Sequence, residues 1–190
     1  MDTPLAFLDR RRSVPSLQLG EPGPDHATLL RMLRSASRVP DHGKRVPFRF
    51  LRIAGDARVA LSRRIVERSQ QIHPEIGEAA LEKDRMRFLR APLIVAVVAK
   101  QGEDAKIPAS ERFASACCAC FALLQAAQAL GFGAQWLTAW PAYDPMILHT
   151  LGLADDERIA GFIHIGTPQV EAPERERPDP IDLLSDWTPA

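Results

Sequence analysis

The strongest hydrophobic pattern in the chain is an unbroken apolar run at residues 92–99, which is rich in β-branched side chains. A run that is apolar at both odd and even positions predicts a central strand covered on both faces. Shorter stretches bounded by turn residues lie at 47–53, 134–138 and 158–166, and they predict three more strands. We therefore expect one sheet with residues 92–99 in its middle.

Helical spacing of apolar residues fills most of the sequence between these strands. The longest such pattern begins at Pro108 and ends at Leu130, where Gly131-Phe132-Gly133 stops it. Alanines and leucines lie on almost every face of this helix, so we expect it to be buried on nearly all sides. The other expected helices are one capped by Thr3 with Pro4 first, one from Asp25 to Pro40, two within residues 57–90 that part at His73-Pro74, and one from Asp144 to Gly152.

This order of elements predicts an α+β fold, a mixed β-sheet flanked by helices on both faces, in a single domain over residues 1–190. Prolines from Pro168 onward argue against regular structure, so residues 168–190 are expected to form an extended C-terminal tail that lies across another surface. Small residues on every face of the long helix indicate close packing against another helix. We expect that helix to belong to a second subunit, which makes the protein a homodimer.

Charge and composition exclude several classes of function. The chain has 24 Lys and Arg against 24 Asp and Glu, a formal net charge of zero, which disfavours a nucleic-acid partner. It has no apolar run long enough to cross a bilayer and no leader pattern at its start, so we expect a cytoplasmic protein without a membrane partner. The histidines are not spaced as helical metal ligands, and Cys117, Cys118 and Cys120 fit no common zinc pattern, so no metal is expected.

Three arginines and a serine, Arg10-Arg11-Arg12-Ser13, directly follow the first expected helix. Arginine presents a rigid fork of donors that matches phosphate oxygens, so this cluster suits a phosphate-binding pocket. Taken alone, an arginine run near a terminus is more often a solvated helix face. A second polar stretch, Arg38-Val39-Pro40-Asp41-His42, is the candidate partner of this arginine cluster.

Seven short motifs follow one another along nearly the whole chain. They are Arg11-Arg12-Ser13, Glu21-Pro22-x-Pro24, Arg38-x-Pro40-Asp41-His42, Pro47-Phe48-Arg49-Phe50, Arg90-Ala91-Pro92-Leu93-Ile94, Gly131-Phe132-Gly133 and Gly161-Phe162-x-x-x-Gly166-Thr167-Pro168-Gln169. Together, in this order and at this spacing, they resemble the FMN-dependent nitroreductase family. The resemblance is closest to its small, single-domain bacterial branch of NAD(P)H nitroreductases.

The resemblance implies a fold that dimerises through its long central helix and holds one FMN in each of two sites built from both subunits. Carried over by position, the flavin contacts are Arg11, Arg12, Ser13, Arg38, His42, Trp136, Leu137 and Thr138. The segment that corresponds to the nicotinamide-nucleotide contact is Ala126, Ala127, Gln128, Ala129, Leu130 and Gly131. His42 also fits a plain turn histidine, and Pro15 and Leu137 stand where members of this branch often carry basic residues.

The resemblance further implies an FMN-dependent oxidoreductase that transfers hydride from NAD(P)H through the flavin to an electrophilic acceptor such as a nitroaromatic compound or a quinone. Because the cofactor supplies the chemistry, no catalytic side chain is expected. Two alternatives stay open. One is another flavin reaction on the same scaffold, such as flavin cleavage or reductive dehalogenation, and the other is flavin binding without turnover.

Overall fold

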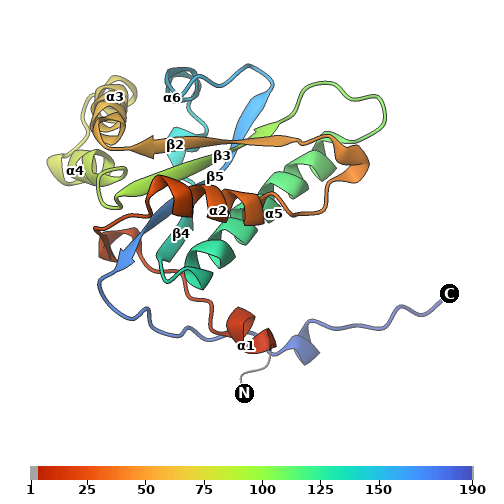
Figure 1. Ribbon diagram of the computed structural model, residues 1–190. Helices are drawn as coiled ribbons and strands as arrows, with labels where there is room; N and C mark the ends of the chain where they lie inside the picture. Colours follow the sequence, from red (N-terminus) through yellow and green to blue (C-terminus); the bar gives the residue numbers. More distant parts are fainter. Residues whose placement is uncertain (1–3, 190) are drawn as a thin grey trace.

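A five-stranded β-sheet with helices on both faces forms the centre of the computed structural model, which describes residues 4–189 (Figure 1). The strands are β1 (Leu19–Gly20), β2 (Phe48–Ala54), β3 (Leu93–Lys100), β4 (Gly133–Leu137) and β5 (Glu157–Pro168). The four strands expected from the hydrophobic pattern are β2 to β5. The short β1 was not expected, because its two residues carry no periodic signal.

The expected helices are present in order along the described part of the chain. They are α1 (Pro4–Asp9), α2 (His26–Ala36), α3 (Asp56–Ile72), α4 (Glu78–Met86), α5 (Ala109–Ala129) and α6 (Pro145–Thr150). Short 3-10 helices occur at Ser16–Gln18, His42–Lys44, Trp140–Ala142 and Pro180–Asp182. The last of these lies in the C-terminal tail, where the prolines predict no regular structure. Thr3, the expected cap of the first helix, lies outside the described residues.

Strand β3 lies between β2 and β5, as its apolar pattern predicts. Strand β5 also pairs with β4, and the last residues of β5 pair with β1. Each of these four strand pairs is antiparallel, so the α+β class is confirmed, but the sheet is antiparallel where a mixed sheet was expected. A strand that is covered on both faces is apolar throughout, so its hydrophobic pattern does not show in which direction its neighbours run.

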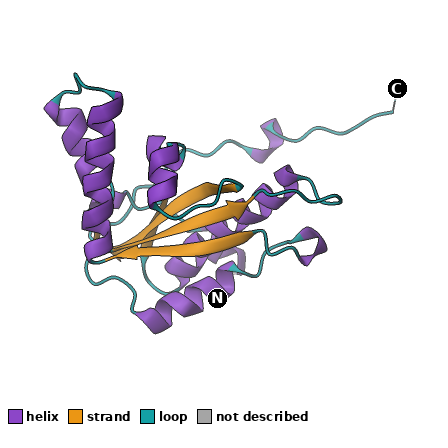
Figure 2. Cartoon of the chain, turned by 90° about the horizontal axis from the view of Figure 1, so that it is seen from above, coloured by secondary structure: helices purple, strands orange, loops and turns teal. Residues whose placement is uncertain are grey.

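Alternate side chains of β3 enter two separate cores, because successive strand residues point to opposite faces of the sheet. Val95 and Val97 pack on one face with α2 and α5. Ile94 and Ala96 pack on the other face with residues of α3 and α6. Figure 1 shows α3, α4 and α6 on one side of the sheet and α2 and α5 on the other, and Figure 2 shows the same chain from above.

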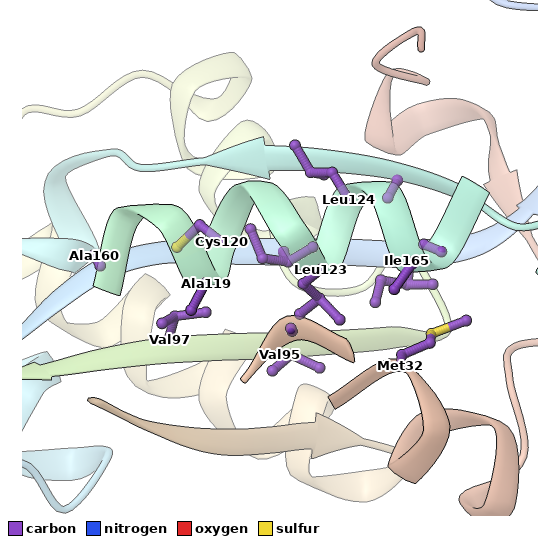
Figure 3. Close-up of a cluster of buried hydrophobic side chains, with 14 of the residues drawn as sticks. Met32, Val95, Val97, Ala119, Cys120, Leu123, Leu124, Ala160 and Ile165 are labelled. Carbon is purple, nitrogen blue, oxygen red and sulfur yellow. The ribbon is translucent and has the colours of Figure 1, made fainter. Parts of the chain in front are cut away.

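Helix α5 buries the side that faces the sheet. Ala119 and Leu123 have no exposed surface and lie over Val97 and Val95 of β3 (Figure 3). Truncating a buried leucine such as Leu123 to alanine costs about 2–5 kcal/mol, because the removed atoms leave a cavity. Small alanines therefore let α5 approach the sheet closely, and the leucines fill the remaining space.

The opposite side of α5 is open to solvent in the single chain. Ala114, Cys118 and Phe121 are exposed there, and Phe121 keeps 46% of its surface accessible. Residues at this spacing form one stripe along a helix. The expectation that α5 is buried on nearly all sides thus holds for its sheet side and leaves an apolar stripe, Ala114, Cys118 and Phe121, without a covering element in the described chain.

Strand β5 carries a fully buried histidine, His164, on the face that packs against Phe88. Its Nδ1 atom has no hydrogen-bond partner among the described residues. Burial, together with the nearby positive charges of Arg87 and Arg90, lowers the pKa of His164 to about 4 from its ordinary value of 6.5. The folded protein therefore holds this side chain in its neutral form.

We expect the free energy of unfolding to fall between pH 6.5 and pH 4 in part because of His164. In this window the unfolded chain binds a proton that the folded chain does not, so stability is full above pH 6.5 and decreases as pH falls. The loss between pH 7 and pH 5 is about 2 kcal/mol. Urea denaturation at pH 7 and pH 5 measures it. The His164→Gln variant is expected to lose this part of the pH dependence. The control variant His73→Gln, at an exposed site, is expected to keep it. Equal pH dependence of all three proteins would contradict the assignment of this effect to His164.

Candidate functional site

The arginine cluster leaves the end of α1 and is fastened to the first residues of β4. The backbone N–H of Val14 donates to the carbonyl oxygen of Ala134 at 3.1 Å. The backbone N–H of Ser16 donates to Oε1 of Gln135 at 2.6 Å. These two bonds fix the direction in which residues 10–13 run past the sheet.

Gly133 makes this close approach possible. A Cβ atom added at Gly133 would lie 2.8 Å from Cδ2 of Leu19 and 3.0 Å from Cγ2 of Val14. Both distances are shorter than ordinary van der Waals contact, so any side chain here would push the segment off the strand. The glycine that ends the loop after α5 thus also sets the position of the arginine cluster.

Positive charge is concentrated at the arginine cluster. Nη1 of Arg11 lies 3.3 Å from the hydroxyl of Ser13, and the guanidinium lies over the ring of Phe121 at 5.9 Å from its centroid. Burial lowers the pKa of Arg11, and the charges of Arg177, Arg175 and Arg12 lower it further. Guanidiniums that repel one another in this way are stabilised by an anion placed between them.

A cavity of about 420 Å³ opens beside the cluster. Arg10 and Arg12 line one side of it, and Leu124, Gln128 and Phe132 line another. Residues 168–174 of the tail form part of its rim. The cavity therefore combines guanidinium groups with an apolar wall, which suits a ligand that has an anionic end and a flat apolar part.

Of the expected flavin contacts, Trp136 and Leu137 are the last two residues of β4, and Thr138 directly follows the strand. Trp136 is half-buried, and its indole N–H donates to the carbonyl oxygen of Ala160 at 3.1 Å. The ring packs onto Gly161, where a Cβ atom would overlap the indole. Leu137 is half-buried and Thr138 is exposed. The backbone hydrogen bond from Val14 to Ala134 thus joins the end of the arginine cluster to the strand that carries Trp136 and Leu137.

The segment expected to contact the nicotinamide nucleotide is the last turn of α5 and the residues that end it. Ala126 and Ala127 are buried in the core, so their side chains are not accessible to a ligand. The side-chain amide of Gln128 donates to the carbonyl oxygen of Phe7 at 3.0 Å and so ties α5 to α1. Ala129 and Gly131 are exposed and Leu130 is half-buried; Gly131 has φ = +81°, the left-handed conformation that ends a helix.

Arg38 and His42 lie at the other end of α5. Helix α2 ends at Ala36, so Arg38 stands just beyond the helix and not in its last turn as the pattern predicts. Nδ1 of His42 lies 2.7 Å from Oε2 of Glu111, near the start of α5. Glu111 and Phe121 are ten residues apart, which is about 15 Å along a helix. A single chain therefore does not bring Arg38 and His42 to the arginine cluster.

Four further residues at the site were not expected from the sequence. Glu174, Arg175 and Arg177 belong to the tail, and Phe121 belongs to a helix that the pattern predicts to be buried. The alternating charges of residues 174–177 give no signal for a site, because alternation is also typical of a solvated surface.

Comparison with known proteins identifies the class of the chain. Residues 8–167 match the model of the Nitroreductase family, and the chain belongs to this family. Over 182 residues it is 37% identical to "Putative NAD(P)H nitroreductase YdjA" of Escherichia coli (strain K12), with 95% of this chain and 97% of that protein covered. The family resemblance noted in the sequence is confirmed.

Solved structures show the same fold. A nitroreductase-like family protein from Bacillus cereus is 23% identical and matches with a TM-score of 0.82 over 98% of this chain and 97% of that chain. A nitroreductase with bound FMN from Bacteroides fragilis NCTC 9343 is 16% identical and matches with a TM-score of 0.72 over 99% of this chain and 100% of that chain.

No helix within residues 4–189 is long and apolar enough to cross a membrane. Nor do three or more His, Cys, Asp or Glu side chains in this range come together in a group that could hold a metal ion.

We expect Gly133→Ala to loosen the arginine cluster. The added methyl group displaces Val14 and Leu19, so the free energy of unfolding should fall by about 1–3 kcal/mol. Trypsin should also cleave faster after residues 10–12. Urea denaturation and timed proteolysis measure the two effects. Gly77→Ala is the matched control, because no atom lies within 4 Å of its Cβ position. A Gly133→Ala variant that behaves like this control would show that the close approach of Val14 and Leu19 to residue 133 is not required.

Proposed function

We propose that the protein is an FMN-dependent oxidoreductase that passes reducing equivalents from NAD(P)H to a small electrophilic acceptor, such as a nitroaromatic compound or a quinone. The observation that carries the proposal is the group Arg11, Arg12 and Ser13 beside a cavity with an apolar wall, in a chain of the Nitroreductase family. The FMN named with the Bacteroides fragilis structure supports the choice of cofactor.

The side chains at the candidate site fit an FMN molecule. Arg11 and Arg12 offer charge-assisted hydrogen bonds to its phosphate, and the hydroxyl of Ser13 is a further donor beside them. Trp136 and Leu137 are half-buried and offer apolar surface at the end of β4. When bound, FMN supplies the hydride chemistry, and the chain supplies binding, orientation and charge. We therefore assign no catalytic acid or base.

We assign the nicotinamide nucleotide to the accessible part of the α5 end, Gln128–Gly131. Gln128 lines the same cavity as Arg10 and Arg12, so a nucleotide held there lies next to the proposed cofactor. The amide of Gln128 is already anchored to α1, which gives this wall of the cavity a fixed position.

A homodimer explains why Arg38 and His42 lie far from the cluster in their own chain. A two-fold axis through Cys118, perpendicular to α5, would pair the exposed stripe with its own copy. It would place Glu111 of one copy beside Gln125 of the other, because these residues lie seven positions before and after Cys118. His42 binds Glu111, so it would arrive beside Phe121 and Arg11 of the second copy.

On the basis of this pairing, we propose that the flavin site is completed by Arg38 and His42 of the second subunit.

The protein is expected to purify with non-covalent FMN and to bleach when NADH or NADPH is added without oxygen. Arg11→Ala should bind FMN about 10-fold to 100-fold more weakly, because one charge-assisted contact contributes roughly 1.5–3 kcal/mol. Fluorescence quenching of added FMN gives the affinity, with the exposed Arg63→Ala as control. Colour without bleaching would indicate flavin binding without turnover. A colourless protein that leaves FMN fluorescence unchanged would contradict the proposed function.

We expect Cys118→Glu to separate the dimer without unfolding the chain. The new carboxylate is solvated in the monomer but buried without a partner in the pair, which costs about 3–5 kcal/mol. Sedimentation velocity at micromolar concentration should show a dimer for the wild type and for the exposed-helix control Ala79→Glu, and a folded monomer for Cys118→Glu. A wild-type monomer that retains bound FMN would overturn the shared site.

A further inference from the structure

Two tryptophans on either side of the last expected flavin contacts pack on opposite faces of the sheet. Strand β4 ends at Leu137, and the 3-10 helix Trp140–Ala142 begins after two further residues. Trp136 packs with the core on the α5 side of the sheet, whereas Trp140 packs with the core on the α3 and α6 side. Because β4 pairs with β5 alone, the chain passes around the edge of the sheet between these two indole rings.

Each of the two indole N–H groups is hydrogen-bonded to a different part of the fold. Trp136 donates to the carbonyl oxygen of Ala160 on β5 at 3.1 Å. Trp140 donates to the carboxylate of Asp84, with its Nε1 atom 3.1 Å from Oδ1 and 3.2 Å from Oδ2. The three residues between the rings, 137–139, are therefore held at both ends.

The held segment offers backbone donors to a ligand. The backbone N–H groups of Thr138 and Ala139 donate to no backbone carbonyl within residues 4–189. Thr138 is exposed and Ala139 is half-buried. Backbone N–H groups need a hydrogen-bond partner, and donors with a fixed position suit the acceptor atoms of a bound ligand. The position of this segment thus matters to any ligand that lies against it.

Asp84 is well placed to fix Trp140. It lies on α4 and keeps 6% of its surface exposed. Its carboxylate also accepts hydrogen bonds from the hydroxyl of Ser69, on α3, and from Nη2 of Arg87, both at 2.8 Å. A buried carboxylate that moved away from these donors would be left as an unpaired charge, so it stays in one place. The indole of Trp140 is thereby fastened to α3 and α4.

We propose that Asp84 and Trp140 are positioning residues of the cofactor site. The buried carboxylate holds the indole, and the indole fixes the backbone of Thr138 and Ala139 against the flavin. The proposal rests on the proposed FMN function. Neither Asp84 nor Trp140 touches the flavin in this assignment. The face of the sheet opposite α5 therefore sets the geometry of one side of the site.

Trp140→Phe tests the role of the indole hydrogen bond, because it keeps a ring in the core and removes the donor. We expect FMN binding to weaken about 10-fold, the size of one hydrogen bond to a charged group. Anaerobic bleaching by the nucleotide that reduces the wild type should also slow by about 10-fold, because the flavin is held less well in place. Fluorescence quenching of added FMN and stopped-flow absorbance measure the two effects.

Ser69→Ala is the matched control. It removes another hydrogen bond to the carboxylate of Asp84, but Ser69 makes no hydrogen bond to residues 136–140. Both Ser69→Ala and Trp140→Phe should lower the urea midpoint of unfolding, because each removes a hydrogen bond to a buried charge. Only Trp140→Phe should change FMN affinity and the bleaching rate.

The variant Asp84→Asn tests whether Asp84 acts through Trp140. Asp84→Asn alone should weaken FMN binding, because the neutral amide holds the indole less strongly than the carboxylate does. The double variant Asp84→Asn/Trp140→Phe should bind FMN no more weakly than Trp140→Phe alone, because the donor that Asp84 holds is already absent.

Three results would count against the proposal, and they are distinguishable. Equal FMN affinity and equal bleaching rates in Trp140→Phe and Ser69→Ala would overturn it, because the Asp84 network would then support only the fold. Additive losses in the double variant would overturn the assignment of Asp84. Both results leave the proposed function standing, since the wild type binds FMN and bleaches. A wild-type protein that binds no FMN would overturn the proposed function, and this assignment with it.

Discussion

Burial of one side of α5 against the sheet is the interaction on which the rest of the structure depends. Ala119 and Leu123 are completely buried over β3, which fixes the helix in both direction and depth. Its first turn then places Glu111 beside His42, and its last turn places Gln128 beside α1. A rigid helix holds these two groups at a fixed separation. The same helix exposes its apolar stripe, so one element sets the core, both parts of the candidate site and the surface that we propose for a second copy.

Much of the fold was predictable because it follows from local pattern. The apolar run of β3 and the glycine after α5 each specify an element without help from distant residues. The errors lie where a distant or competing contact decides. Strand β1 has two residues, and its partner Pro168 lies far along the chain. Helix α2 ends before Arg38 because the hydroxyl of Ser37 binds the carbonyl oxygen of Leu33 at 2.8 Å, and Pro40 cannot continue a helix.

The candidate site was predictable in its residues but not in its grouping. The family resemblance names Arg11 and Trp136, but only the hydrogen bond from Val14 to Ala134 shows that the arginine cluster is joined to the strand of Trp136. The motifs also name Arg38, which the fold of a single chain places elsewhere. The tail arginines have neither a motif nor a periodic pattern, since a proline-rich segment takes its position from what it contacts. Contacts between residues far apart in sequence therefore carry the information that sequence patterns lack.

A segment near each end of the described chain meets at the arginine cluster, since the ion pair between Arg12 and Glu174 joins them. This has a practical consequence for labelling the protein. A tag or label inserted in either of these two segments adds its mass and charge next to the cavity. The exposed turn at residues 73–77, between α3 and α4, belongs to the opposite face of the sheet. Insertion of a label or an immobilisation peptide in that turn leaves the cluster and the stripe of α5 untouched.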